Sequence, residues 1–331
     1  MPLADDIPAH RLLVGLWQLS GAHGTIDPRR AIPQMLAYHD AGLTTWDLAD
    51  HYGPAEEFIG AFRTLLRDAR GDAALARLRA FTKWVPQGGP MTRQVVERAV
   101  DTSLRRMQTD RLDMLQFHWW DYSDPAYLDA LGHLAALRDA GKIRHVALTN
   151  FDTQRCAAIA AHGVAFVSDQ VQYSLVDTRP ARRLAPWCAA NGVGLLTYGT
   201  LCGGLLTDAY LGRPEPQRAE LNTASLRKYK MMVDAWGGWA LFQELLAALR
   251  GVATRHNAQI AQIAVRAILD RPAVAGAIIG ARLGISEHLA ENTAIAAIAL
   301  DAADTAQIEA VLARSNDLLA SIGDCGAEYR R

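Results

Sequence analysis

Short apolar runs alternate along the chain with longer segments in which apolar positions recur at helical spacing. The runs are typical of buried strands, and the longer segments are typical of amphipathic helices. Strands that alternate with helices in this way indicate a parallel sheet joined by helical crossovers. Eight strands are predicted: Leu12–Trp17, Thr44–Leu48, Ala80–Trp84, Leu112–His118, His145–Thr149, Phe166–Gln170, Gly194–Tyr198 and Gly276–Ile279.

The segments between the strands carry helix start and stop signals. Asp27 followed by Pro28 is typical of an N-cap and a first helical residue, and Gly42 marks the stop. Asp124, Pro125 and Gly141 repeat this arrangement. Further helices are predicted after Thr92, from Asp152, and over Pro180–Asn191, Trp239–His256, Ala258–Asp270, Ser286–Ala297 and Ala302–Ala320.

Eight strands, each followed by a helix, predict an α/β protein with a closed (β/α)8 barrel of the TIM type. We expect a single domain over residues 1–331, with an extra helix at the C-terminal end. The connection from Tyr198 to the helix that begins at Ala258 is unusually long. We interpret residues 199–257 as a lid or binding segment over the end of the barrel where active sites lie.

Composition favours a cytoplasmic enzyme. Half of the 331 residues are hydrophobic, and 34 basic residues nearly balance 35 acidic ones, which gives a net charge of −1. The chain therefore lacks the basic field that nucleic acids or anionic membranes require. No apolar run approaches the roughly 18 residues that span a bilayer. The four cysteines are too widely spread for a zinc knuckle or a disulfide framework, so we expect no metal. The oligomeric state stays open.

Polar residues stand at the predicted C-terminal ends of three successive strands. Asp47 ends the second strand, Lys83 the third and His118 the fourth, while Tyr52 lies in the loop after Asp47. Each alone has an ordinary explanation: Asp47 as an N-cap or rim ion pair, Lys83 as a surface residue, His118 as a core histidine. Because strand ends converge at the mouth of a barrel, we expect the four side chains to lie together.

Such a set suits proton delivery to a carbonyl oxygen. A phenol has a pKa near 10, and a nearby ammonium stabilises the phenolate. We therefore expect Lys83 to lower the pKa of Tyr52, which would be the general acid. Asp47 would hold Lys83 in place, and His118 would donate or relay a hydrogen bond at the carbonyl oxygen.

The motifs around these residues resemble those of the aldo-keto reductase superfamily. WDLADHYG resembles its aspartate strand end and catalytic-tyrosine loop, FTKW its lysine strand and LQFHWWD its histidine strand. ALTNF and SDQVQYS resemble its carboxamide-binding strand ends, with Thr149 in place of serine and Asp169 in place of asparagine. LLTYGTLCGGLL and IIGARLGISEHLAEN resemble its cofactor-binding stretches, and all matches follow the family's order.

The resemblance implies hydride transfer between a nicotinamide cofactor and a substrate that is an aldehyde, ketone, sugar or the corresponding alcohol. It implies that Thr149, Asn150 and Gln170 hold the carboxamide and that Tyr198 stacks on the nicotinamide ring. Backbone groups of residues 199–206 would lie along the pyrophosphate. The implied cofactor-binding residues are Thr149, Asn150, Gln170, Tyr198, Gly199, Leu201, Arg282, Ser286, His288, Glu291 and Asn292.

The choice of cofactor depends on the segment after the eighth strand. Arg282 suits a 2′-phosphate, and Ser286 at a helix start would add a hydroxyl and a helix N-terminus. These residues favour NADP(H). NAD(H) stays possible, because His288 stands where many NADPH-dependent members carry an arginine. Arg282 could instead be a solvated charge at the rim.

Aromatic residues near the predicted mouth suggest a substrate pocket. We expect Trp17, Trp119 and Trp120 in its wall, whereas Trp84 is better explained as barrel packing. An aromatic pocket suits flat or apolar carbonyl compounds. Cys202, after Tyr198, is interpreted as a packing residue, with a redox-sensitive thiol as the alternative.

Two functions from different classes fit these residues. The first is an NAD(P)H-dependent oxidoreductase acting on a small-molecule carbonyl or alcohol. The alternative is a regulatory subunit that binds the cofactor and senses redox state with little turnover, as some members of the superfamily do. A metal-dependent barrel hydrolase is disfavoured, because no His-x-His follows the first strand and Lys83 lies near His118.

Overall fold

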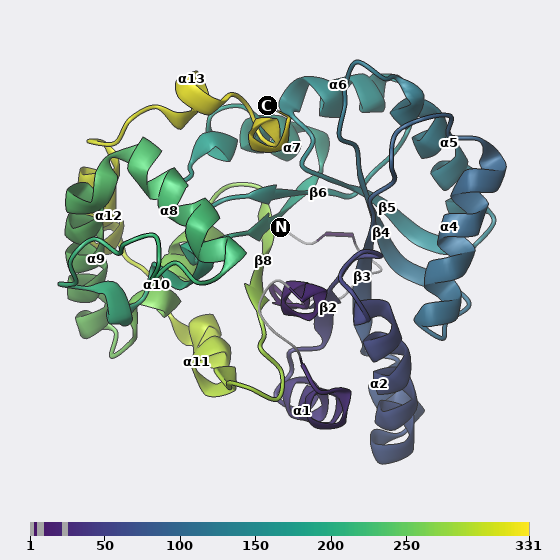
Figure 1. Cartoon of the computed structure of the whole chain (residues 1–331), viewed down its shortest axis with the longest axis horizontal. Helices are drawn as coiled ribbons and strands as arrows, with labels where there is room; N and C mark the ends of the chain where they lie inside the picture. The colour runs from purple at the N-terminus through teal and green to yellow at the C-terminus, as the bar shows by residue number, and fades with distance from the viewer. Residues whose placement is uncertain (1–2, 5–9, 22–25, 331) are drawn as a thin grey trace.

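The computed structural model describes residues 3–4, 10–21 and 26–330, and the predicted start of the domain at Met1 lies outside them. Eight parallel strands form a closed barrel in chain order, and β8 pairs with β1 to close it (Figure 1). The predicted (β/α)8 barrel is therefore confirmed. The strands are β1 Leu12–Gly15, β2 Thr45–Asp47, β3 Arg79–Trp84, β4 Leu112–His118, β5 Ile143–Thr149, β6 Ser168–Gln172, β7 Gly194–Tyr198 and β8 Val274–Gly280.

Helices surround the barrel as an outer layer (Figure 1). Their buried faces, such as Val96 and Val100 of α4 or Leu131 and Leu134 of α5, pack in the main apolar core. The helices are α1 Pro28–Asp40, α2 Ala55–Arg70, α3 Asp72–Leu75, α4 Arg93–Arg106, α5 Ala126–Asp139, α6 Thr153–Ala161, α7 Leu184–Asn191, α8 Ala224–Trp236, α9 Gly238–Arg255, α10 Ile260–Leu269, α11 Leu289–Ala294, α12 Ala302–Leu312 and α13 Leu318–Ile322. Among the described residues, no helix is both long and apolar enough to cross a membrane.

A second, smaller apolar cluster is built from alternate strand residues. It includes Leu13, Phe81, Met114, Ala147 and Leu196. Because side chains alternate along a strand, the residue two positions further on shares the same face. Those residues are Gly15, Lys83, Gln116, Thr149 and Tyr198. One face of the strands thus changes from apolar to polar toward the C-terminal ends, and this change positions the site.

Three predicted helices are interrupted in the structure. Pro180–Asn191 is divided into the 3-10 turn η2 (Arg179–Ala181) and α7, with a turn at Arg182 and Arg183 between them. Ser286–Ala297 is divided into α11 and the 3-10 turn η5 (Ile295–Ala297). Ala302–Ala320 is divided into α12 and α13, since the Asp317 side chain caps a new helix. The predicted helix Trp239–His256 is confirmed as α9.

The end of β1 also differs from the prediction. Trp17 does not belong to the strand but begins the 3-10 turn η1 (Trp17–Ser20). The Leu16 N–H still donates to the Asp47 carbonyl, and Leu19 N–H then donates to the Leu16 carbonyl and closes the turn. The turn carries Trp17 to the mouth of the barrel.

The long connection after β7 folds against the mouth of the barrel. It contains the 3-10 turns η3 (Cys202–Gly204) and η4 (Asp208–Tyr210), followed by α8 and α9. Gly199 has a φ of +69°, and a Cβ atom there would lie 2.2 Å from the Tyr229 hydroxyl of α8. Only glycine fits this close approach.

The C-terminal segment closes over the same end of the barrel. It contains the 3-10 turn η6 (Ala327–Tyr329). The Arg330 guanidinium donates to the carbonyl of Asn150 at 2.8 Å and to that of Trp119 at 2.6 Å. These bonds tie the end of the chain to the loops that follow β4 and β5.

Candidate active site

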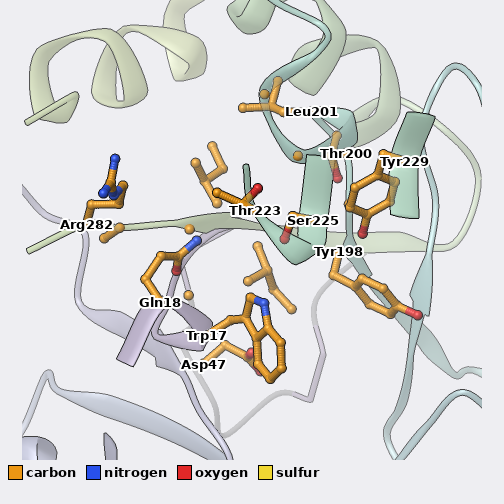
Figure 2. Close-up of a pocket in the computed structure, with 18 of the residues that line it drawn as sticks. Trp17, Gln18, Asp47, Tyr198, Thr200, Leu201, Thr223, Ser225, Tyr229 and Arg282 are labelled. Atoms are coloured by element: carbon orange, nitrogen blue, oxygen red, sulfur yellow. The ribbon is translucent and has the colours of Figure 1, made fainter. Parts of the chain in front are cut away.

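A cavity of about 1050 Å³ lies at the C-terminal end of the barrel. Figure 2 shows Arg282 at one end of it and Tyr198 at the other, with Trp17 and Asp47 between them. Nearly all residues singled out from the sequence line this cavity. They are Trp17, Asp47, Tyr52, Lys83, His118, Trp120, Thr149, Asn150, Gln170, Tyr198, Gly199, Leu201, Arg282, Ser286, His288, Glu291 and Asn292.

Asp47 and Lys83 form a buried ion pair. The Lys83 ammonium lies 2.9 and 2.7 Å from the two Asp47 carboxylate oxygens and 3.0 Å from the Leu48 carbonyl oxygen, and both side chains are 4% exposed. Burial lowers the pKa of Lys83, while Asp47 acts in the opposite direction. Each charge therefore supplies the partner that the other needs away from water.

Two glutamine side chains complete the surroundings of Asp47. Gln116 and Gln170 donate to Asp47 Oδ1 at 2.9 and 2.7 Å, and Gln170 also donates to Gln116 Oε1 at 2.6 Å. Gln116 was not among the residues predicted from the sequence. The signal that could have found it is a polar residue two positions before His118, and so on the same face of β4.

Tyr52 lies beside the ion pair. The Lys83 ammonium is 5.1 Å from the centre of its ring, and Trp17 and His51 pack edge-on against it at 4.9 and 4.8 Å. Burial, followed by the negative charge of Asp47, raises the pKa of Tyr52 well above its usual range. The expected lowering of this pKa does not appear, because burial and the Asp47 charge outweigh the stabilisation that Lys83 offers the phenolate. Asp47 binds the ammonium with both oxygens and offsets its charge, so the phenol keeps its proton.

His118 is neutral at physiological pH. Burial, followed by the positive charge of Arg330, lowers the pKa of His118 to about 3. Its Nδ1 atom is buried without a hydrogen-bond partner in the described part of the chain. The ring of Trp120 packs edge-on against it at 4.3 Å. A neutral imidazole carries one N–H, so His118 can still donate a single hydrogen bond.

The expected position of Trp119 is wrong. His118 and Trp120 reach the cavity, whereas Trp119 is 1% exposed and stacks on Phe117 in the apolar core. Its indole N–H donates to the carbonyls of Asp121 and Asp124. The alternation of β4 continues past His118 and turns Trp119 to the opposite side.

Polar groups suited to a planar amide lie next to Tyr198. Asn150 has a φ of +59°, a conformation that asparagine tolerates, and its Oδ1 accepts from the Tyr198 hydroxyl at 2.8 Å. This leaves the Asn150 Nδ2 group as a donor. Gln170, with its Nε2 bound to Asp47 and Gln116, leaves Oε1 as an acceptor. Thr149 instead donates its hydroxyl to the Gln170 carbonyl at 3.2 Å.

The opposite end of the cavity carries the residues expected to hold the adenosine part of a cofactor. Arg282 and His288 are exposed there, and Glu291 and Asn292 belong to α11. The expected helix N-terminus at Ser286 is wrong, because α11 begins at Leu289. Ser286 lies instead in a turn, where its N–H donates to the Arg282 carbonyl.

Cys202 is buried, and its Sγ lies 3.5 Å from the Ser174 hydroxyl. Burial raises the pKa of Cys202 to about 12. A thiol that stays protonated is a poor redox sensor, so its surroundings fit the packing role.

The cavity also has walls that the sequence analysis did not assign. Lys228 and Tyr229 come from α8, and Tyr329 comes from η6. These residues are distant in sequence from the strand ends, and no local motif marks them. The sequence run that contains α8 was nevertheless expected to form a lid or binding segment.

Comparisons with known proteins agree with this geometry. The sequence model of the aldo/keto reductase family matches residues 11–313. The protein called aldo-keto reductase YhdN from Bacillus subtilis (strain 168) is 29% identical over 305 residues, which cover 88% of this chain and 87% of that one. A protein called NADH-specific methylglyoxal reductase from Escherichia coli (strain K12) is 25% identical over 323 residues, with coverage of 90% and 93%.

A solved structure shows the same fold. The aldo/keto reductase from Klebsiella pneumoniae, in complex with NADP and acetate, has a TM-score of 0.68 at 24% identity and covers 92% of each chain. At this level of identity the likeness concerns the barrel alone.

Proposed function

The chain belongs to the aldo/keto reductase family, and from this premise we propose that it interconverts a carbonyl group and its alcohol with Tyr52 as the proton donor. The observation that carries the proposal is the cluster of Tyr52, His118 and the Asp47–Lys83 pair in one cavity. Carbonyl reduction with a nicotinamide cofactor is the activity of the family.

The proposed mechanism follows from the properties of these side chains. When bound, the reduced nicotinamide supplies the hydride that is added to the carbonyl carbon. Tyr52 holds its proton, because its pKa is raised, and gives it to the carbonyl oxygen as negative charge develops there. Lys83 then stabilises the phenolate. The neutral His118 donates a hydrogen bond to the same oxygen, which orients the substrate.

The chain's own residues fit the nicotinamide part of the cofactor. A carboxamide needs a donor for its oxygen and an acceptor for its amino group, and Asn150 Nδ2 and Gln170 Oε1 offer these groups in the cavity wall. The Tyr198 ring borders the same part of the cavity and would stack on the nicotinamide. Backbone groups from Gly199 to Leu201 would lie along the pyrophosphate.

We further propose that the cofactor is NADP(H). Arg282 with the Ser286 hydroxyl would bind a 2′-phosphate, and His288 would lie beside them. The names of similar proteins include both an NADH-specific enzyme and one seen with NADP, so the choice within this family depends on such residues. An Arg282→Ala substitution is expected to raise the Kd for NADPH about 10- to 100-fold and to leave that for NADH nearly unchanged.

Tyr52→Phe tests the proposed mechanism. The wild type is expected to reduce at least one aldehyde, dicarbonyl or sugar, and the variant to lose about 10²- to 10⁴-fold in kcat. The cofactor Kd, followed by its fluorescence, stays the same because the ring is retained. Tyr127→Phe, which removes the hydroxyl of a buried tyrosine outside the cavity, is the matched control.

Two outcomes would contradict the proposal. Wild-type turnover in Tyr52→Phe would exclude this residue as the proton donor. Tight cofactor binding by the wild type without turnover of any carbonyl would instead favour the redox-sensing role.

A further inference from the structure

Lys228 places an ammonium group in the cavity wall among three tyrosine rings. It lies in the second turn of α8, whose start is fixed by the Thr223 hydroxyl accepting from the Leu226 N–H. The Lys228 ammonium lies 4.3, 5.3 and 5.4 Å from the ring centres of Tyr329, Tyr198 and Tyr229. It is half-buried, so the rings replace part of its hydration.

Lys228 begins a chain of hydrogen bonds that uses one of its donors, and the described residues provide no acceptor for the other two. Lys228 donates to the Tyr329 hydroxyl. Tyr329 lies 2.9 Å from the Tyr198 hydroxyl, which itself donates to Asn150 Oδ1, so Tyr329 is the donor to Tyr198. The proton of the Tyr329 hydroxyl is therefore in use. An ammonium has three N–H groups, and only one of them is engaged in this chain of bonds.

No carboxylate of the described residues pairs with Lys228. Lys230, on the same helix, binds both Glu215 and Asp234. Glu328, next to Tyr329 in sequence, is turned instead toward the guanidinium of Arg179 at 3.0 Å. The neighbours of Lys228 one helical turn away in each direction are Ala224 and Met232, which offer no charge.

This ammonium lies close to the catalytic cluster. The Tyr329 ring that it contacts packs 6.5 Å from the ring of His118 and 6.5 Å from that of Trp120. The His118 ring and the Lys228 ammonium lie 6.5 and 4.3 Å from the centre of the same Tyr329 ring. One small substituted aromatic molecule is therefore long enough to reach both groups. Trp17 and Trp120, 37% and 43% exposed, border the space and present apolar surface to it.

We propose that Lys228 binds an anionic group, a carboxylate or a phosphate, on the carbonyl substrate. The inference rests on the proposed carbonyl reduction and adds the substrate class: the carbonyl is placed at Tyr52 and His118, and the anion lies several bonds away at the ammonium. An anion would accept hydrogen bonds from the two remaining N–H groups of Lys228. The site is partly dehydrated, and charge-assisted hydrogen bonds are strong in such surroundings.

Two matched pairs of benzaldehydes test this inference. 4-Carboxybenzaldehyde is compared with methyl 4-formylbenzoate, and 4-formylphenyl phosphate with 4-methoxybenzaldehyde, so that the pairs separate carboxylate from phosphate. Binding to the cofactor-loaded full chain is followed by tryptophan fluorescence, and turnover is followed by cofactor absorbance. The wild type is expected to bind at least one anionic probe about tenfold or more tightly than its neutral partner.

The variants identify the residue responsible. Lys228→Met is expected to weaken binding of the anionic probe about 10- to 100-fold and to leave the neutral probe and the cofactor within about twofold. Lys228→Arg keeps the charge and the preference. Arg227→Met removes an exposed charge from the same turn, outside the cavity, and also keeps the preference.

Three results would overturn the inference. One is the absence of an anion preference in the wild type, and another is an equal loss for charged and neutral probes in Lys228→Met. The third is a weaker cofactor Kd in Lys228→Met, which would assign the ammonium to the cofactor or to the chain of bonds ending at Asn150. The binding measurement decides these points even without turnover. Failure of every probe to turn over would count against the proposed function instead.

Discussion

The Lys83 ammonium is held by both carboxylate oxygens of Asp47, at 2.9 and 2.7 Å, with neither side chain exposed beyond 4%. A buried ion pair of this kind is compatible with a stable fold only while both partners are charged. If one charge is removed, the other remains buried without water or a partner to compensate for its lost hydration. Burial is the main cause of the raised pKa of Tyr52, and the charge of Asp47 adds to it. The carboxylate that binds the ammonium offsets its effect on the neighbouring ring.

Asp47→Asn should therefore be strongly destabilising. We expect a loss of about 3–5 kcal/mol in the free energy of unfolding, because Lys83 is left as an uncompensated buried charge. Turnover should fall together with stability. Urea denaturation measures the first effect and steady-state kinetics the second.

The control is Asp50→Asn. Asp50 is a more exposed carboxylate in the loop after β2, where it pairs with the neighbouring His51. It should cost no more than about 1 kcal/mol. The double variant Asp47→Asn with Lys83→Met should recover part of the lost stability. If the double variant were less stable than Asp47→Asn alone, the account of the pair would be wrong.

Gln116 is expected to act through Gln170 and Asp47. Gln116→Leu removes the acceptor that holds the Gln170 amide at 2.6 Å and one donor to Asp47. We expect a loss of about 1–3 kcal/mol in stability. The Kd of the nicotinamide cofactor should also rise about fivefold, as for one hydrogen bond of about 1 kcal/mol.

Gln172→Leu separates these two effects. Gln172 is a buried glutamine of β6 outside the cavity, and it donates to Asp177. Its loss should lower stability and leave cofactor binding unchanged. A cofactor Kd that stays constant in Gln116→Leu would show that Gln170 keeps its orientation without Gln116.

The dependence of kcat/KM on pH should show no inflection from the titration of His118 in the physiological range. Since the pKa of His118 is lowered to about 3, the ring is already neutral at pH 5 and stays neutral at higher pH. We expect the dependence of kcat/KM on pH between 5 and 8 to be the same in shape for the wild type and for His118→Gln, although the variant is slower. His51→Gln and His288→Gln control for the other two histidines in the cavity. A wild-type inflection near pH 6.5 that only His118→Gln removes would refute this expectation.

The strand ends that carry the candidate site were predictable, because the sequence features that mark them are local. The strand Leu112–His118 was predicted with the bounds of β4, since its apolar run ends where the polar face begins. Trp119 was misplaced because it follows the strand directly, and only the continued alternation of side chains reveals which side it takes. Gln116 lay within a strand already recognised, and its place two positions before His118 gave its face, but its partners Asp47 and Gln170 come from other strands.

The remaining parts of the site depend on contacts between distant segments. Tyr329 reaches the cavity because Arg330 binds carbonyls of Trp119 and Asn150, which are more than 170 residues away in sequence. Nothing in the sequence around Tyr329 specifies these partners. The same holds for Lys228, whose contacts with Tyr198 and Tyr329 come from two distant segments.

Asp304 joins α9 to α12 through buried hydrogen bonds. Its Oδ1 accepts from the Arg255 guanidinium at 2.6 and 3.0 Å, and its Oδ2 lies 2.6 Å from the His256 ring nitrogen. Its side chain is almost fully buried. Burial alone would raise the pKa of Asp304, but the hydrogen bonds from His256 and Arg255 outweigh it and lower this pKa to about 2.

The stability that Asp304 contributes should therefore depend on pH with a defined sign. The unfolded chain binds this proton near pH 4, so the contribution is complete above that pH and is lost as the pH falls toward 2. We expect Asp304→Asn to lower the free energy of unfolding by about 1–3 kcal/mol at pH 7 and by clearly less at pH 3. Asp139→Asn, at an exposed acid, should change it by less than about 0.5 kcal/mol at either pH. Urea denaturation at both pH values decides the matter, because an equal loss at pH 7 and pH 3 would mean that packing around Asp304, and not its charge, joins the two helices.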